Sequence, residues 1–280
     1  MPFKSILVCL NEVNRAQVLL DLAARIAETQ SAHVIGFYVV PAVRISSSVG
    51  YQVTAQVFES HREYFSARVE LVKAQFDETM QRNGLEGEWQ LVESSSPLIA
   101  DPVAERALGS DLIIASQAER HGESGVELDF APRILMETGR PVLLVPRAGR
   151  FTSCGRLAVI GWNATREAAR AAFDAVPMLM HAEAVHVTSV DVAKTGTQAG
   201  SLPGAELARA LSRHGVTAVA ETVPAGGATS GQALLGHAAD LGADLLVMGA
   251  YGHTRLREFV FGGATRHILH GMTVPVLMSH

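Results

Sequence analysis

Two kinds of hydrophobic pattern alternate along the chain, and their order predicts a parallel sheet covered by helices. Short apolar runs, such as residues 5–10 and 157–161, lack a polar face, which is typical of strands buried on both sides. Between such runs, apolar residues recur every three or four positions; in residues 16–29 they form one helical stripe. Strands that alternate with helices in this way connect as right-handed crossovers, so the predicted fold class is α/β.

The pattern predicts ten strands and eight helical stretches. The strands are expected at residues 5–10, 33–40, 88–93, 110–115, 141–145, 157–161, 184–190, 218–222, 244–248 and 274–278. The helices are expected at 16–29, 52–82, 96–108, 133–137, 165–180, 205–214, 229–241 and 264–270. Ser96 before Pro97 is expected to cap one helix, and Thr229 with Gln232 predicts a capping box at another.

The sequence repeats itself once. Ser-Asp-Leu-Ile-Ile-Ala at 110–115 matches Ala-Asp-Leu-Leu-Val-Met at 243–248, and Pro-Val-Leu-Leu at 141–144 matches Pro-Val-Leu-Met at 275–278. Residues 146–156 between the halves are rich in Gly, Arg, Ser and Pro, as in a linker. We therefore expect two tandem domains, residues 1–147 and 155–280, each with a five-stranded parallel sheet flanked by helices.

Composition and charge narrow the class of protein. Of the 280 residues 48% are apolar and 18% charged, enough for packed cores and unlike a disordered chain. A net charge of −5 gives no bulk attraction to nucleic acid or anionic lipid. Cys9 and Cys154 are expected to be free thiols. The sequence shows neither a signal peptide nor an apolar stretch near the ~20 residues of a membrane span, so a soluble, cytoplasmic protein is expected.

Candidate chemistry lies in the second half. In open parallel sheets, ligands bind beyond the carboxyl ends of the strands where the strand order reverses, here the loops after the first and fourth strands of each half. The loop after the fourth strand of the second half contains Gly249, Gly252, Gly262, Gly263 and Thr265. Free N–H groups at the helix start that follows suit a phosphate. The spacing alone leaves open that these glycines serve only tight turns.

These residues resemble the universal stress protein family. Its ATP-binding members carry Gly, two residues, Gly, nine residues, Gly and then Ser or Thr. Gly249, Gly252 and Gly262 match that spacing. Gly263 departs from it at the Ser/Thr position, and Thr265 matches a further Ser/Thr that is common in the family.

The loop after the first strand of the second half supports the same resemblance. Family members usually have Asp-Gly-Ser there, with the Asp beside the adenosine, and this chain has Asn163, Ala164 and Thr165. An Asn can still donate and accept hydrogen bonds. Asn163 and Thr165 could also serve only as caps of the next helix, and both roles can hold together.

The resemblance implies tandem adenine-nucleotide-hydrolase-like, Rossmann-like domains packed as an intrachain pseudo-dimer, with a homodimer of the chain as a further expectation. It also implies ATP bound by the second domain, and a regulatory role in stress response rather than a metabolic one. The first domain is expected to have lost the site, because less suitable residues stand at the five motif positions: Ser116, Glu119, Asp129, Phe130 and Pro132. Asn11 stands where its adenosine-binding Asp would be.

Other interpretations stay open at this point. The chain could be a scaffold without nucleotide, acting through its surface or the long helix 52–82, or binding an apolar ligand in the first-half cleft. It could also be an enzyme acting on the nucleotide, although no nucleophile or general base is evident and at most slow ATP hydrolysis is expected. No metal site is expected, because His267 and His270 lack a third ligand. Glu167 is expected to be an ordinary first-turn helix acid, and His280 to be mobile.

Overall fold

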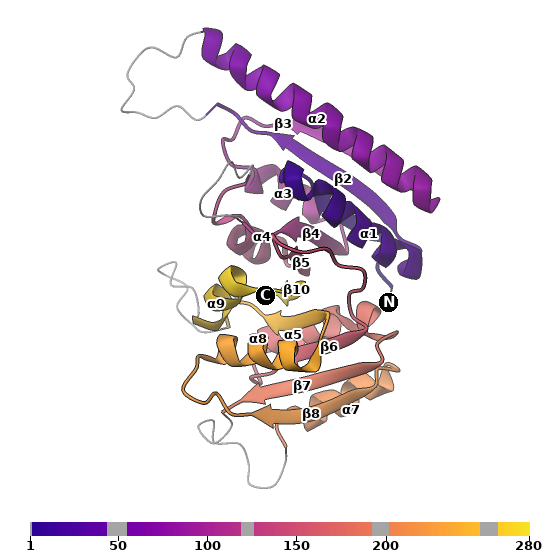
Figure 1. Cartoon of the computed structure of the whole chain (residues 1–280), viewed down its shortest axis with the longest axis vertical. Helices are drawn as coiled ribbons and strands as arrows, with labels where there is room; N and C mark the ends of the chain where they lie inside the picture. Colours follow the sequence, from indigo (N-terminus) through magenta and orange to yellow (C-terminus); the bar gives the residue numbers. More distant parts are fainter. Residues whose placement is uncertain (1, 44–54, 119–125, 192–201, 253–262) are drawn as a thin grey trace.

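The ten strands that the structure describes form one continuous sheet. The computed structural model describes residues 2–43, 55–118, 126–191, 202–252 and 263–280. The strand order is β3-β2-β1-β4-β5-β10-β9-β6-β7-β8. Strands pair in parallel within each half, and the halves meet where β5 (Val142–Val145) pairs antiparallel with β10 (Val276–Ser279). Figure 1 shows the two halves stacked along the long axis, with this pair near the middle. The predicted α/β class is confirmed, and the two predicted five-stranded sheets merge into one.

The helices and strands follow the predicted order. In the first half they are β1 (Ser5–Cys9), a short 3-10 helix (Val13–Arg15), α1 (Ala16–Gln30), β2 (His33–Val40), α2 (Ala55–Asn83), β3 (Gly87–Glu93), α3 (Ala100–Ala107), β4 (Leu112–Ser116), α4 (Phe130–Thr138) and β5. In the second half they are β6 (Leu157–Gly161), α5 (Arg166–Asp174), α6 (Val176–Leu179), β7 (Ala184–Val190), α7 (Ala205–Arg213), β8 (Ala218–Val223), α8 (Ser230–Leu241), β9 (Leu245–Gly249), α9 (Gly263–Gly271) and β10. The predicted helix 165–180 is divided between α5 and α6.

The predicted capping box at the start of α8 is confirmed. The Thr229 side chain accepts a hydrogen bond from the backbone N–H of Gln232, and the Gln232 side chain accepts one from the backbone N–H of Thr229 at 2.8 Å. Two N–H groups that a helix start leaves without partners are thereby satisfied locally.

The predicted start of α3 at Ser96 is wrong. The helix begins at Ala100, and the Ser96 hydroxyl instead accepts from the N–H of Leu98 within the preceding turn. The backbone N–H of Ala100 donates to the Glu127 carboxylate at 2.7 Å. A side chain 27 residues away therefore provides the hydrogen bond that a local cap was expected to provide.

The repeat in the sequence corresponds to a repeated hydrogen-bond pattern. Asp111, before β4, accepts hydrogen bonds from the backbone N–H groups of Lys4 and Ser5 at 2.8 and 3.0 Å. Asp244, before β9, accepts from the N–H groups of residues 155–157 at 3.0 to 3.3 Å. In each half, one carboxylate therefore fastens the start of the first strand to the start of the fourth.

The seam between the halves is built from buried strands and a few polar bridges. Every residue of β5 and β10 is buried. The Gln117 amide of the first half donates to the carbonyls of Leu269 and His270 in α9, at 2.9 and 3.1 Å. The Gln30 amide at the end of α1 donates to the carbonyl of Pro177 at 2.8 Å. These contacts satisfy backbone carbonyls of one half with side chains of the other.

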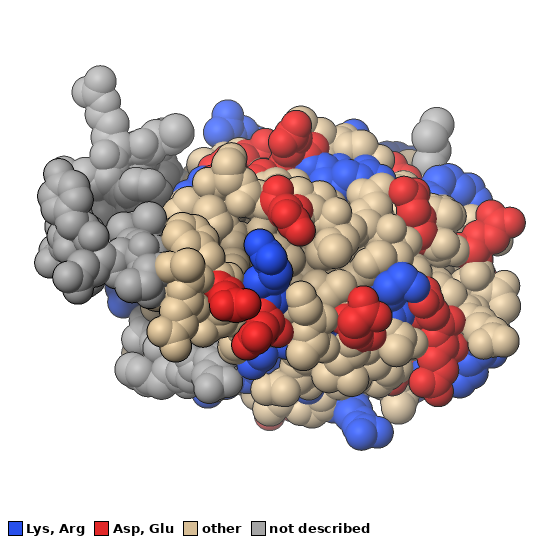
Figure 2. Space-filling model, turned by 90° about the horizontal axis from the view of Figure 1, so that it is seen from above, with Lys and Arg blue, Asp and Glu red and all other residues tan. Residues whose placement is uncertain are grey.

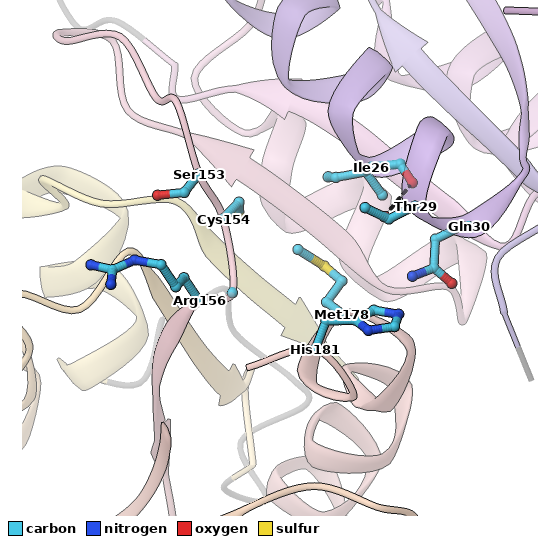
Figure 3. Close-up of a pocket in the computed structure, with 9 residues that line it drawn as sticks. Ile26, Thr29, Gln30, Ser153, Cys154, Arg156, Met178 and His181 are labelled. Carbon is cyan, nitrogen blue, oxygen red and sulfur yellow. Dashed lines mark hydrogen bonds between the residues drawn. The ribbon is translucent and has the colours of Figure 1, made fainter. Parts of the chain in front are cut away.

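A small cavity lies at this seam, between α1, the linker and the end of α6. Figure 3 shows Gln30 of α1 and Cys154 of the linker on opposite sides of it, with Met178 and His181 below. Its volume is about 160 Å³. Ligand sites usually measure roughly 300–1,000 Å³, so this cavity is too small for a nucleotide.

Both cysteines, Cys9 and Cys154, are free thiols, as predicted.

The surface at the α2 end carries both signs of charge. Figure 2, which looks onto this end, shows acidic and basic side chains interspersed rather than gathered by sign. Within the described residues, no helix has the length and apolar character to cross a membrane.

We expect Asp244→Asn to destabilise the second half. Both carboxylate oxygens of Asp244 accept hydrogen bonds from backbone N–H groups, and Asn would replace one of these oxygens with an NH₂ group, which cannot accept. The loss should be about 1–3 kcal/mol, measured by urea unfolding followed by circular dichroism. Asp240→Asn, on the exposed face of α8, is the control and should stay within about 0.5 kcal/mol of the unchanged chain. Equal stabilities of the two variants would contradict this role of Asp244.

Candidate functional site

The strand order places a topological switch point at the ends of β6 and β9, which we call the β6/β9 crevice. The chain runs from β6 outward to β7 and β8, then returns to β9 on the other side of β6. The loops that leave β6 and β9 therefore diverge at neighbouring strand ends, the arrangement at which open α/β sheets bind ligands. In the first half, β1 lies between β2 and β4 in the same way.

Two of the predicted glycines are required by close packing in this crevice. A Cβ on Gly249 would lie 2.4 Å from the backbone nitrogen of Ala168, in the first turn of α5. A Cβ on Gly252 would lie 2.9 Å from a carboxylate oxygen of Glu167 and 3.3 Å from the hydroxyl of Thr165. Neither glycine has a positive φ, so close packing and not a left-handed backbone requires glycine at these positions. The structure thus brings the predicted Gly249, Gly252 and Thr165 together.

The loop after β6 is organised by its own side chains. Thr165 is the N-cap of α5, and its hydroxyl accepts from the N–H of Ala168 at 3.3 Å. The same hydroxyl donates to the Asn163 side chain at 2.9 Å. Both residues therefore take part in capping, as one interpretation predicted. Asn163 is exposed, which keeps it accessible to a ligand.

The described part of each crevice loop holds a non-glycine residue in the left-handed region. Ala164 has φ 56° and Tyr251 has φ 59°, two of the four such residues in the described part of the chain. That conformation costs an L-residue about 1–2 kcal/mol relative to the right-handed one. Backbone strain concentrates at functional sites. Ala164 also stands where the resemblance places a glycine, the residue that adopts this φ without strain.

Glu167 is a residue of this crevice that the sequence interpretation missed. It was expected to be an ordinary first-turn helix acid; it does lie in the first turn of α5, but it is only 5% exposed and its carboxylate pairs with the Arg166 guanidinium at 2.5 Å. Burial opposes its ionisation, but hydrogen bonds from Arg166 and Thr165 outweigh that effect and lower the pKa of the Glu167 carboxyl. Its burial follows from the packing of α5 on Gly249, which leaves no signal in the local pattern of α5.

The start of α9 forms the remaining wall. Gly262 lies outside the described residues, Gly263 is the exposed first residue of α9, and Thr265 is buried. A Cβ on Gly263 would meet no atom within 4 Å. Gly263 is therefore accessible to a ligand, whereas Thr265 is enclosed by protein.

The end of the chain holds the loop after β9 in place. The N–H of Ala250 donates to the carbonyl of Ser279 at 2.9 Å, and the His280 ring contacts the carbonyl of Ala250 at 3.0 Å. His280 also packs edge to face with Tyr251, with ring centroids 6.5 Å apart. The prediction that His280 is mobile is wrong, because its ring is tied to the first residue beyond β9.

The corresponding crevice of the first half is organised differently. The Asn11 amide is buried and exchanges two hydrogen bonds with the backbone of Val39, at 2.7 and 3.1 Å. Phe130 begins α4 and is 1% exposed, and Pro132 in the first turn of that helix has no N–H. Glu119 lies outside the described residues. Asn11 is thus engaged with the backbone, and the loss of the nucleotide site in this half stays a prediction.

The strand order defines a doubly wound α/β protein, and comparisons with known proteins narrow that class. The model of the universal stress protein family matches residues 159–280. Universal stress protein Slr1230 of Synechocystis sp. strain PCC 6803 is 25% identical over 295 residues, covering 98% of this chain and 99% of its own. Residues 159–280 therefore form a universal stress protein domain, and the first half of the chain repeats its strand order.

Solved structures show the same fold over the whole chain. A universal stress protein from Archaeoglobus fulgidus superposes with a TM-score of 0.69 at 14% identity, covering 98% of this chain and 97% of its own. The functionally unknown protein PA1789 from Pseudomonas aeruginosa superposes with a TM-score of 0.56 at 19% identity, covering 99% and 92%. Two other universal stress proteins have been solved with cAMP and with dAMP, and they superpose on this chain with TM-scores of 0.35 and 0.32.

We expect Gly249→Ala to destabilise the protein by about 1–3 kcal/mol, because the added methyl would force α5 away from β9. Gly236→Ala, in an exposed interior turn of α8 with no atom near the added Cβ, should instead stabilise by about 0.5–1 kcal/mol. Urea unfolding of both variants measures the two effects. A Gly249→Ala variant as stable as Gly236→Ala would exclude the close approach as a constraint.

We expect Ala164→Gly to stabilise the protein, because glycine adopts a φ of 56° without the steric penalty of alanine. Greater freedom of glycine in the unfolded chain offsets part of this gain, so the net change should be about 0–1 kcal/mol. Ala169→Gly, inside α5, should lower the stability by about 1 kcal/mol and is the matched control. The sign of the difference between the two unfolding midpoints is the measurement, and a larger loss for Ala164→Gly would contradict it.

Proposed function

We propose that the second domain, residues 155–280, binds an adenine nucleotide, specifically ATP, and that the protein has a regulatory role in stress response. The observation that carries this proposal is the meeting of two strained loops at the β6/β9 switch point, beside the exposed start of α9. Asn163 would contact the adenosine, and Gly249 and Gly252 would shape the loop around the ribose and phosphates. Gly262, Gly263 and Thr265 would hold the phosphates through N–H and hydroxyl donors. The first domain, residues 1–147, would not bind nucleotide in this manner.

The buried carboxylate of Glu167 limits how the nucleotide could lie. It is ionised beside Gly252, so it would repel phosphate oxygens and accept hydrogen bonds from hydroxyl groups. We infer that the ribose hydroxyls would lie near Glu167 and Gly252. The phosphates would then lie toward the start of α9, where the N–H groups and the dipole of the helix favour negative charge.

The alternative is a universal stress protein scaffold that binds a protein partner or an apolar ligand without nucleotide. Two observations favour it: Gly263 replaces the expected hydroxyl residue, and Thr265 is buried. We place the protein in the cytoplasm and assign it no catalytic residue; a homodimer of the whole chain stays a prediction.

Calorimetric titration of ATP into the full chain and into Gly262→Asp tests the proposal. We expect the unchanged chain to bind about one ATP, and the aspartate to weaken binding tenfold or more through repulsion of the phosphates, which corresponds to about 1.4 kcal/mol. Native mass spectrometry of the purified protein would show in addition whether a nucleotide is already bound.

Asp129→Gly is the matched control, because it makes the reverse change at the equivalent position of the first half. It should leave ATP binding unchanged. Equal binding by Gly262→Asp and the unchanged chain would remove the site assignment, and absence of binding by the unchanged chain would favour the scaffold. Weaker binding by Asp129→Gly would place the nucleotide in the first half.

A further inference from the structure

A second cluster of functional side chains lies on the α8 side of the sheet, near its outer edge. His186 extends from β7, Glu221 from the edge strand β8 and His237 from α8. Thr188 pairs in register with Glu221 on the neighbouring strand, and His186 lies two residues earlier on the same face of β7. One ligand atom of each of the three residues lies within 4.8 Å of the others.

The carboxylate of Glu221 lies between the two imidazoles. One of its oxygens is 3.2 Å from Nδ1 of His186, and the other contacts Nε2 of His237. The Thr188 hydroxyl donates to the second oxygen at 2.8 Å and is itself fully buried. Four side chains from three elements thus converge, and the imidazole rings lie edge to face with centroids 6.4 Å apart.

We propose that His186, Glu221 and His237 bind a divalent transition-metal ion, with Zn²⁺ as the best fit. Two imidazole nitrogens and one carboxylate oxygen are the protein ligands of a common kind of open zinc site. Zinc–ligand bonds of about 2.0–2.2 Å in a tetrahedron place neighbouring ligand atoms about 3.3 Å apart. The 3.2 Å between Nδ1 of His186 and one oxygen of Glu221 matches that spacing, whereas Nε2 of His237 contacts the other oxygen more closely and would move away from it to admit the ion. Imidazole ligands favour Zn²⁺, Cu²⁺ or Ni²⁺ over Mg²⁺ and Ca²⁺.

The surroundings suit an ion that exchanges with solvent. The side chains of His186 and His237 are each 18% exposed, and that of Glu221 is 28% exposed. Thr188 orients the carboxylate as an outer-shell partner does in metal sites. A solvent molecule would complete the tetrahedron.

This site is distinct from the β6/β9 crevice. His237 lies in the second half of α8, whereas the first residues of that helix pack against α9, where a Cβ on Gly231 would lie 2.9 Å from the carbonyl of Ala264. The histidine pair noted in the sequence, His267 and His270, is also separate, and the ring of His270 contacts the carbonyl of Arg266 at 2.6 Å.

The test is titration of Zn²⁺ into the full chain after chelator dialysis, by calorimetry, with Co²⁺ absorption as a readout of ligand geometry. We expect one equivalent with a tetrahedral Co²⁺ spectrum. Glu221→Gln keeps the shape of the side chain and should weaken binding by tenfold or more, as should His237→Ala. Thr188→Val should weaken it by a smaller factor, in the manner of an outer-shell residue.

The double variant His267→Ala/His270→Ala is the matched control and should retain the equivalent and the spectrum. Circular dichroism of each variant verifies folding, and Zn²⁺ should raise the unfolding temperature of the unchanged chain but not of folded Glu221→Gln. Undiminished binding by folded Glu221→Gln and His237→Ala would overturn the proposal. So would absence of Zn²⁺ binding by the unchanged chain, which would leave the cluster as a hydrogen-bonded network.

Discussion

The close approach of the first turn of α5 to the end of β9 is the contact on which the candidate site depends. Gly249 allows it, because any side chain there would overlap the backbone of α5. The approach buries Glu167, brings Thr165 near Gly252 and sets the β6 loop beside the β9 loop. Ala164 and Tyr251, both with left-handed backbone, lie in these two loops. A packing constraint of the core thus shapes the crevice.

The duplicated architecture depends on a second contact, the antiparallel pairing of β5 with β10. Each strand would otherwise be an apolar edge with unpaired backbone groups, which favours association with other chains. Pairing the two edges buries both strands and joins the halves into one sheet. The two halves share one hydrogen-bond pattern: Asp111 and Asp244 each accept hydrogen bonds from backbone N–H groups at the start of the first strand of their half.

The two halves have diverged at equivalent strand ends. In the first half the Asn11 amide is engaged with the backbone of Val39, whereas in the second half Asn163 remains exposed beside its helix cap. The second half also carries polar groups on the α8 side of β7 and β8. The helix α8 therefore lies between two distinct features, touching α9 at its start and the His186–Glu221–His237 cluster further along.

The sequence by itself determined the order of strands and helices, the duplication and the position of the crevice loops, because hydrophobic periodicity and local caps such as Thr229 are properties of neighbouring residues. Tertiary structure decided what depends on residues distant in the chain. The Glu127 carboxylate, and not Ser96, accepts the hydrogen bond from the start of α3. Glu167 is buried by the close approach of α5 to Gly249. The cluster of His186, Glu221 and His237 forms only when β7, β8 and α8 pack. Such contacts leave no local pattern, because the partners are set by strand order and helix packing.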